Sequence, residues 1–174
     1  MEVGAILDMK WSLSSKGQPS LALTTSSGDL NLYLLNSSRL VLETTLKIDP
    51  ENNPVILSLD WNNRNRFLTD KSTKIATSDS KGCVHIVDVD CDGDLKVVQS
   101  LKNHGFESWV TVFDVWNENV VYSGGDDCQL FMSDLRIGNK VRVSTFECFR
   151  VFFFYYISVI LCWAWIGLET YLEM

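Results

Sequence analysis

The sequence has few cysteines, prolines and basic residues, and each shortage excludes a class of protein. Its 3 prolines and 10 glycines in 174 residues are too few for a collagen-like chain or a flexible linker. Its 5 cysteines are an odd number and include no C-x-x-C pair, which argues against a disulfide scaffold and a zinc ribbon. They are Cys83, Cys91, Cys128, Cys148 and Cys162. Reduced thiols of this kind predict a cytoplasmic protein.

Basic residues are outnumbered by acidic ones, 15 to 22, so the net charge is -7. Nucleic-acid binding depends on a basic surface that releases counterions from phosphate, so no nucleic-acid partner is expected. Residues 1–15 lack the basic start and long apolar centre of a secretory signal. The sequence contains no phosphate-binding loop and no cluster with metal-ligand spacing, so neither a cofactor nor a metal is expected.

One long apolar run differs from the rest of the chain. Val151–Leu168 contains no charged residue, Arg150 precedes it and Glu169 follows it. A run of this length meets the minimum for a membrane-spanning helix whose N-terminal side is cytoplasmic. The alternatives are a buried terminal strand pair or a segment foreign to the fold, such as translated intron, a frameshift product or an alternative terminal exon. A membrane partner is expected only if the run is a genuine anchor.

Period-two alternation of apolar and polar residues runs through residues 1–139 and predicts β-strands. Three times a strand leads through a turn rich in Gly, Asp or Ser into another strand. Trp11, Trp61 and Trp116 accompany these units at intervals of about 50 residues, which is close to the length of a propeller blade. The prediction is an all-β, WD40-type β-propeller with about three N-terminal blades and an incomplete ring, since a closed ring needs more blades. Trp109 and these three tryptophans are expected in the core.

The expected blades cover about 1–50, 51–100 and 101–139, and residues 140–174 form a hydrophobic tail outside the propeller. The third blade has the clearest motif, with Asn103-His104 before it, Ser123-Gly124-Gly125-Asp126-Asp127 as its turn and Ser133-Asp134 at its close. These positions resemble the Gly-His, turn and Trp-Asp landmarks of a WD40 repeat. In such repeats the turn aspartate bonds the histidine ring, so His104 and Asp127 are predicted to form a structural tie. The turn glycines are expected to adopt positive φ.

Several segments are similar to a particular family of WD-repeat proteins. They are His104-Gly105-Phe106-Glu107-Ser108-Trp109, Val121-Tyr122-Ser123-Gly124-Gly125-Asp126-Asp127 and Asp134-Leu135-Arg136, with Leu7-Asp8-Met9-Lys10-Trp11 and Ser58-Leu59-Asp60-Trp61 nearer the N-terminus. Together they resemble the N-terminal part of the diphthine methylesterase family of diphthamide biosynthesis. The resemblance implies hydrolysis of the methyl ester of methylated diphthine, a modified histidine of elongation factor 2. That factor would be the protein substrate.

The sequence leaves the catalytic residues unknown. Ester hydrolysis needs a nucleophile or activated water, a base and donors for the oxyanion, and the G-x-S-x-G elbow is absent from the sequence. The only histidines are His85 and His104. His85 alternates with apolar neighbours and is expected to face solvent or an adjoining blade. The alternative to a structural His104 is a general base near Glu107 and Asp126.

Residues 88–94 imitate the start of an EF-hand loop, with acidic residues at alternate positions and Gly93 at the sixth. The twelfth position is Gln99 instead of a bidentate glutamate, so a solvated acidic turn is the preferred interpretation. Two functions from different classes therefore remain open. One is a methylesterase whose short form is inactive, and the other is a non-catalytic WD-repeat scaffold, with or without a membrane anchor.

Overall fold

The computed structural model describes residues 4–12, 19–64, 73–90, 92–137 and 139–145. In this part of the chain the regular elements are strands and one short 3-10 helix, η1, at Asn62–Arg64. The strands are β1 Ile6–Trp11, β2 Ser20–Thr25, β3 Asp29–Asn36, β4 Arg39–Lys47, β5 Ile56–Trp61, β6 Thr73–Asp79, β7 Cys83–Val89, β8 Leu95–Lys102, β9 Ser108–Phe113, β10 Val120–Gly125, β11 Gln129–Asp134 and β12 Asn139–Thr145.

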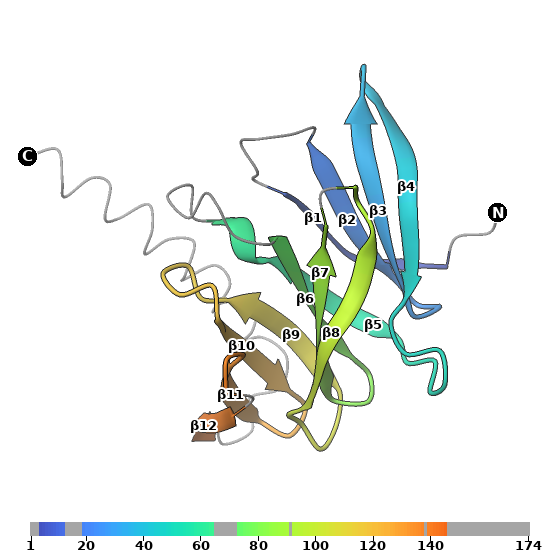
Figure 1. Ribbon diagram of the computed structural model, residues 1–174. Coiled ribbons are helices and arrows are strands. Elements are labelled where there is room, and N and C mark those ends of the chain that lie inside the picture. Colours follow the sequence, from blue (N-terminus) through green and yellow to red (C-terminus); the bar gives the residue numbers. More distant parts are fainter. Residues whose placement is uncertain (1–3, 13–18, 65–72, 91, 138, 146–174) are drawn as a thin grey trace, which may run out of the picture.

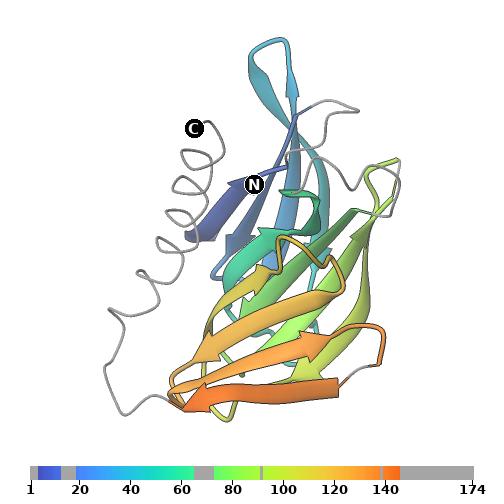
Figure 2. The same cartoon turned by 90° about the vertical axis from the view of Figure 1, so that its left-hand side faces the viewer.

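The strands form three antiparallel four-stranded sheets, each built from four consecutive strands. Each sheet is a meander that begins on its inner strand, which is β1, β5 or β9. The inner strands of successive sheets contact one another, so the sheets follow as three blades arranged like a fan (Figure 1). The turned view shows the third blade, β9 to β12, stacked beside the second (Figure 2). The predicted all-β fold of about three propeller blades is confirmed.

Two hydrophobic cores hold the blades together, one at each junction. The first joins blades one and two and comprises Ala22, Leu30, Leu32, Ile48, Ile56, Leu59, Trp61, Ile75 and Val87. The second joins blades two and three and comprises Ala76, Val84, Ile86, Phe113 and Val121. The period-two pattern produces both cores. Successive residues along a strand of blade two point to opposite faces of the sheet, one toward blade one and the next toward blade three.

The three b–c turns, which join the second and third strands of each blade, share one geometry but fill it with different residues. Gly28 and Gly82 have positive φ in the first two blades, and Cys128 takes the same left-handed position, at φ 59°, in the third. The expectation that Gly124 and Gly125 supply positive φ is therefore wrong. Gly125 is required for space instead, because a Cβ there would lie 2.7 Å from Nδ1 of His104.

Of the four tryptophans expected in the core, only Trp61 is buried. Trp11 and Trp109 are about half exposed, and Trp116 is 77% exposed in the loop that follows β9. The strand register aligns Phe113, not Trp116, with Trp11 and Trp61. The regular tryptophan spacing was therefore misleading in the third blade, since β9 ends three residues before Trp116.

The third sheet continues past the boundary expected at residue 139. β12 pairs with β11 and completes the blade with a fourth strand, in which Val141 and Val143 repeat the period-two pattern. The apolar run 151–168 lies outside the described residues. Within the described residues, no helix has the length and apolar character needed to cross a bilayer.

Candidate functional sites

The imidazole of His104 lies buried between the second and third blades. Its Nδ1 is 2.9 Å from Oδ1 of Asp127 and its Nε2 is 3.0 Å from Oγ of Ser123. The second carboxylate oxygen of Asp127 accepts the backbone N–H of Gly105 at 3.2 Å. The ring of Phe131 packs edge-on against the imidazole, with centroids 5.0 Å apart. His104 therefore connects the start of blade three to its b–c turn and to its second strand.

These contacts bear on the chemistry available to His104. With Nδ1–H donating to Asp127, Nε2 accepts from the Ser123 hydroxyl, which itself accepts from Asn103 Nδ2 at 3.0 Å. Both ring nitrogens are occupied and the side chain has no exposed surface. A general base needs a free lone pair facing substrate, so this arrangement favours the structural role over the catalytic one.

Asp126 and Glu107 are the carboxylates expected near a catalytic His104. Asp126 is exposed and uses its backbone N–H to bond the carbonyl oxygen of Glu107 at 2.9 Å. That bond joins the two backbones, and the hydrogen bonds described for the His104 ring go to Asp127 and Ser123.

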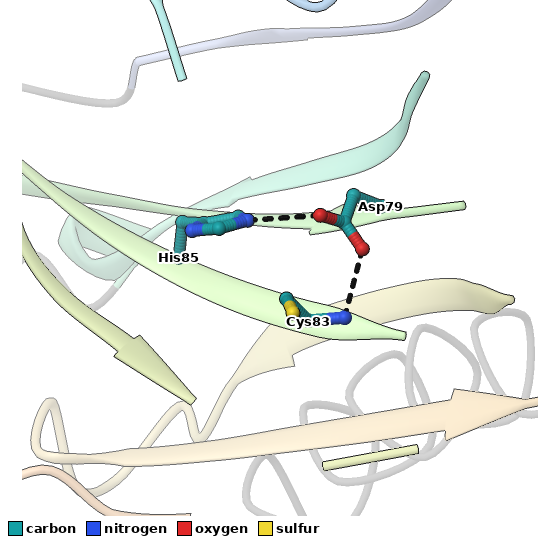
Figure 3. Close-up of side chains that lie close together, drawn as sticks. All are labelled: Asp79, Cys83 and His85. Atoms are coloured by element: carbon teal, nitrogen blue, oxygen red, sulfur yellow. Dashed lines mark hydrogen bonds and ion pairs between the residues drawn. The ribbon is translucent and has the colours of Figure 1, made fainter. Parts of the chain in front are cut away.

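A second imidazole–carboxylate pair, which the sequence did not predict, lies in blade two (Figure 3). Nε2 of His85 is 3.0 Å from Oδ2 of Asp79, and its Nδ1 is 2.8 Å from Oγ of Ser100. The other oxygen of Asp79 accepts the backbone N–H groups of Lys81 and Cys83. The side chains of Asp79 and His85 are 1% and 4% exposed. Of the two orientations expected for His85, the structure shows the one toward an adjoining blade, since His85 shares its face of β7 with Val87 of the core between blades one and two.

Cys83 extends this pair to a group of three chemically different side chains. Its Sγ, a carboxylate oxygen of Asp79 and a ring nitrogen of His85 all lie within 4.8 Å of one another. Burial, and then the charge of Asp79, raise the pKa of the Cys83 thiol. The signal in the sequence is the spacing Asp-x-x-x-Cys-x-His across a tight turn, which places all three side chains on one face of two paired strands.

The strand register shows that the histidine–aspartate pair of blade two occupies different positions from the pair of blade three. His85 stands opposite Thr77, as Phe131 stands opposite Ser123, so His85 occupies the place of an aromatic residue. The imidazole of blade three enters from the connection before β9, whereas the imidazole of blade two comes from its own third strand.

Charged side chains also link the inner strands. The carboxylate of Asp60, whose side chain is fully buried, lies 3.4 Å from Nζ of Lys10 and accepts the backbone N–H of Phe113 at 2.9 Å. Asp8 accepts the backbone N–H of Leu59 at 2.9 Å. These contacts join neighbouring blades across β1, β5 and β9.

The EF-hand-like segment forms the turn between β7 and β8. Oδ1 of Asp90 accepts the backbone N–H groups of Asp92 and Asp94, both at 2.9 Å, and both of these residues are exposed. The solvated acidic turn is therefore the correct interpretation.

Comparison with known proteins gives consistent relatives. No protein-family model matches the chain. The chain is 36% identical over 156 residues to diphthine methyltransferase of Mus musculus, covering 84% of this chain and 32% of that protein. It is 37% identical over 144 residues to diphthine methyltransferase of Homo sapiens, covering 80% and 32%. A homologue from Dictyostelium discoideum is 34% identical over 134 residues, covering 75% and 34%.

The meander sheets and their buried imidazole ties define the chain as blades of a β-propeller protein. It spans about a third of the length of the curated relatives it matches. The chain belongs to the diphthine methyltransferase family, to whose N-terminal part it corresponds.

Proposed function

We propose that this chain supplies the N-terminal blades of an enzyme that removes the methyl group from methylated diphthine on elongation factor 2. The observation that carries the proposal is the identity of 36–37% to relatives named diphthine methyltransferase, along 80–84% of the chain. A cytoplasmic location is part of the proposal, because the substrate is a factor of translation.

The reaction proposed is hydrolysis of a methyl ester. Water adds to the ester carbonyl, the bond from the carbonyl carbon to the methoxy oxygen breaks, and the products are a carboxylate, methanol and a proton. The name of the relatives describes transfer of a methyl group, and transfer would require a methyl acceptor other than water. The two reactions differ in their products, so they can be separated directly.

The described histidines support the blades in this proposal. His85 and His104 each have both ring nitrogens within hydrogen-bond distance of a partner, so neither presents a free lone pair to a water molecule while these hydrogen bonds are in place. The groups that activate water are left unassigned.

A chimera tests the proposal. The segment of the mouse relative that aligns with this chain is replaced by residues 4–145, which contain all three blades. The expected result is loss of the methyl ester from methylated elongation factor 2, with release of methanol and uptake of heavy oxygen from labelled water into the new carboxylate. The unmodified mouse relative is the positive control.

Two results contradict the proposal. A folded chimera that does not act on the methyl ester would support the scaffold function instead, which is favoured by the exposed loop aromatics Phe106 and Trp116. Methyl loss without methanol, dependent on an added acceptor, would establish transfer in place of hydrolysis.

A further inference from the structure

We propose that Asp79, Cys83 and His85 bind a zinc-like divalent metal ion at the junction of blades one and two. The proposal concerns an ion site and does not depend on the methylesterase function. Carboxylate, thiolate and imidazole are the three side-chain ligands that zinc uses, and here one of each converges within 4.8 Å.

The strand geometry explains why the three groups meet. Asp79 ends β6, and Cys83 and His85 are alternate residues of β7, so all three lie on the same face of the sheet (Figure 3). That face packs against blade one, where Ile48 fills the position that His104 occupies in blade three. At this junction the polar group is buried beside the apolar core that joins blades one and two.

A second observation is a buried hydroxyl without a partner on the residue that pairs with His85. Thr77, which pairs directly with His85 in the β6–β7 register, is fully buried. Among the described residues its hydroxyl has no hydrogen-bond partner. The corresponding Ser123 of blade three bonds both His104 and Asn103. Buried hydroxyls are normally bonded, so the Thr77 hydroxyl calls for a partner, which a metal-bound water would supply.

The surroundings of His85 suit a metal ligand. Nδ1 of His85 lies 2.8 Å from Oγ of Ser100, and a serine hydroxyl can accept a hydrogen bond from that nitrogen as well as donate one to it. A metal-bound imidazole usually donates its second N–H to an oxygen in this way, which fixes the ring. Asp49, from the connection after β4, adds negative charge near Cys83 and His85.

Binding can be written with its protons. The ion takes the place of the hydrogen bond between Nε2–H of His85 and Asp79, and the imidazole proton moves to Nδ1, which then donates a hydrogen bond to Oγ of Ser100. The Cys83 thiol loses its proton to solvent. A doubly charged ion, one carboxylate, one thiolate and a neutral imidazole then have no net charge, which suits a buried position.

Cobalt(II) is the probe, because thiolate coordination produces a near-ultraviolet charge-transfer band. The full chain, purified in mild detergent, is titrated with cobalt(II) and then with zinc(II). The expected result is a band that saturates at one ion per chain and is displaced by zinc. Cys83→Ser should abolish the band, and Asp79→Asn should weaken binding by about 10-fold or more.

Cys128→Ser is the matched control, because Cys128 is the other described free cysteine and lies in the b–c turn of blade three. It should keep the band unchanged. Thermal unfolding supplies a second measurement, in which zinc should raise the midpoint of the wild-type chain and not that of Cys83→Ser. Absence of a thiolate band in the wild-type chain, its persistence in Cys83→Ser, or an equal zinc shift in both proteins would overturn the proposal.

Discussion

The carboxylate of Asp60, on the inner strand of blade two, accepts the backbone N–H of Phe113 on the inner strand of blade three. Asp8 makes the same contact with Leu59 one blade earlier. The strand registers align Asp8 with Ser58 and Asp60 with Val112, so each aspartate bonds the residue that follows its counterpart in the next blade. The inner strand of a blade is paired on one side only, so some of its N–H groups need a partner outside the sheet. Aspartate supplies it and links the blades.

Replacing Asp60 tests this linkage. Asp60→Ala should lower the free energy of unfolding by about 1–3 kcal/mol, because the N–H of Phe113 loses its acceptor in a buried setting. Asp60→Asn should lose less, since an amide oxygen still accepts that bond. Urea unfolding followed by tryptophan fluorescence measures both variants. Equal stability of Asp60→Ala and the wild-type chain would contradict the linkage.

The tie of blade three gives a separate prediction. Asp127→Ala removes the acceptor of both His104 Nδ1 and the Gly105 N–H, and should lower the free energy of unfolding by about 1–3 kcal/mol. Asp126→Ala is the control, because Asp126 is exposed and its neighbour contact uses the backbone. If Asp127→Ala in the chimera kept full stability and lost activity, Asp127 would be catalytic instead.

The thiol of Cys83 should lose its proton at a higher pH in the folded chain than in the unfolded chain. Its pKa is raised by burial and by Asp79, so the folded chain holds the thiol proton more tightly than the unfolded chain. The stability that this contributes is present below the ordinary thiol pKa and is lost as pH rises through the folded pKa. Because the thiolate is the reactive form, alkylation of Cys83 should rise at higher pH in the native chain than in urea. Peptide mass spectrometry measures the pH at which alkylation of Cys83 is half-maximal. The same value in the native chain and in urea would refute the prediction.

The 174-residue chain by itself should lack methylesterase activity. Met9 and Trp11 on β1, and Val141 and Val143 on β12, are roughly half exposed at the two outer blades. A catalytic site needs donors held rigidly in place, and blades with uncovered faces do not supply that support. The assay is methanol release from methylated elongation factor 2. Demethylation of many substrate molecules per chain would contradict it.

The apolar tail should make the chain poorly soluble. Phe152–Tyr156 is an uncharged, β-prone window, and such windows promote aggregation when exposed to water. Removal of residues 146–174 should raise the soluble fraction without restoring activity, and it spares β12, which a cut after residue 140 would remove. A monodisperse, soluble full chain would refute this. Retention in membranes after an alkaline carbonate wash, with folded blades, would support the anchor.

Much of the architecture was predictable because it depends on neighbouring residues. Alternation marks strands, and turn residues mark hairpins, since both follow from backbone sterics over a few positions. The boundaries were less predictable. Trp116 fitted the expected interval but lies in a loop, and β12 begins where the repeat landmarks end. The spacing of the tryptophans and the turn motifs indicate that a repeat is present. Where each strand of the repeat ends depends on its pairing with the adjoining strand.

The class of fold, the number of blades and the candidate tie between His104 and Asp127 could all be predicted from the sequence, because they depend on short-range patterns and on likeness to a family. Which side chains meet inside the blades follows from the three-dimensional packing alone. Asp79, Cys83 and His85 come together because a tight turn folds one strand onto the next. Asp60 reaches Phe113, 53 positions away, because two blades pack face to face. Such contacts arise from strand register and blade packing, which the order of residues along the chain does not display.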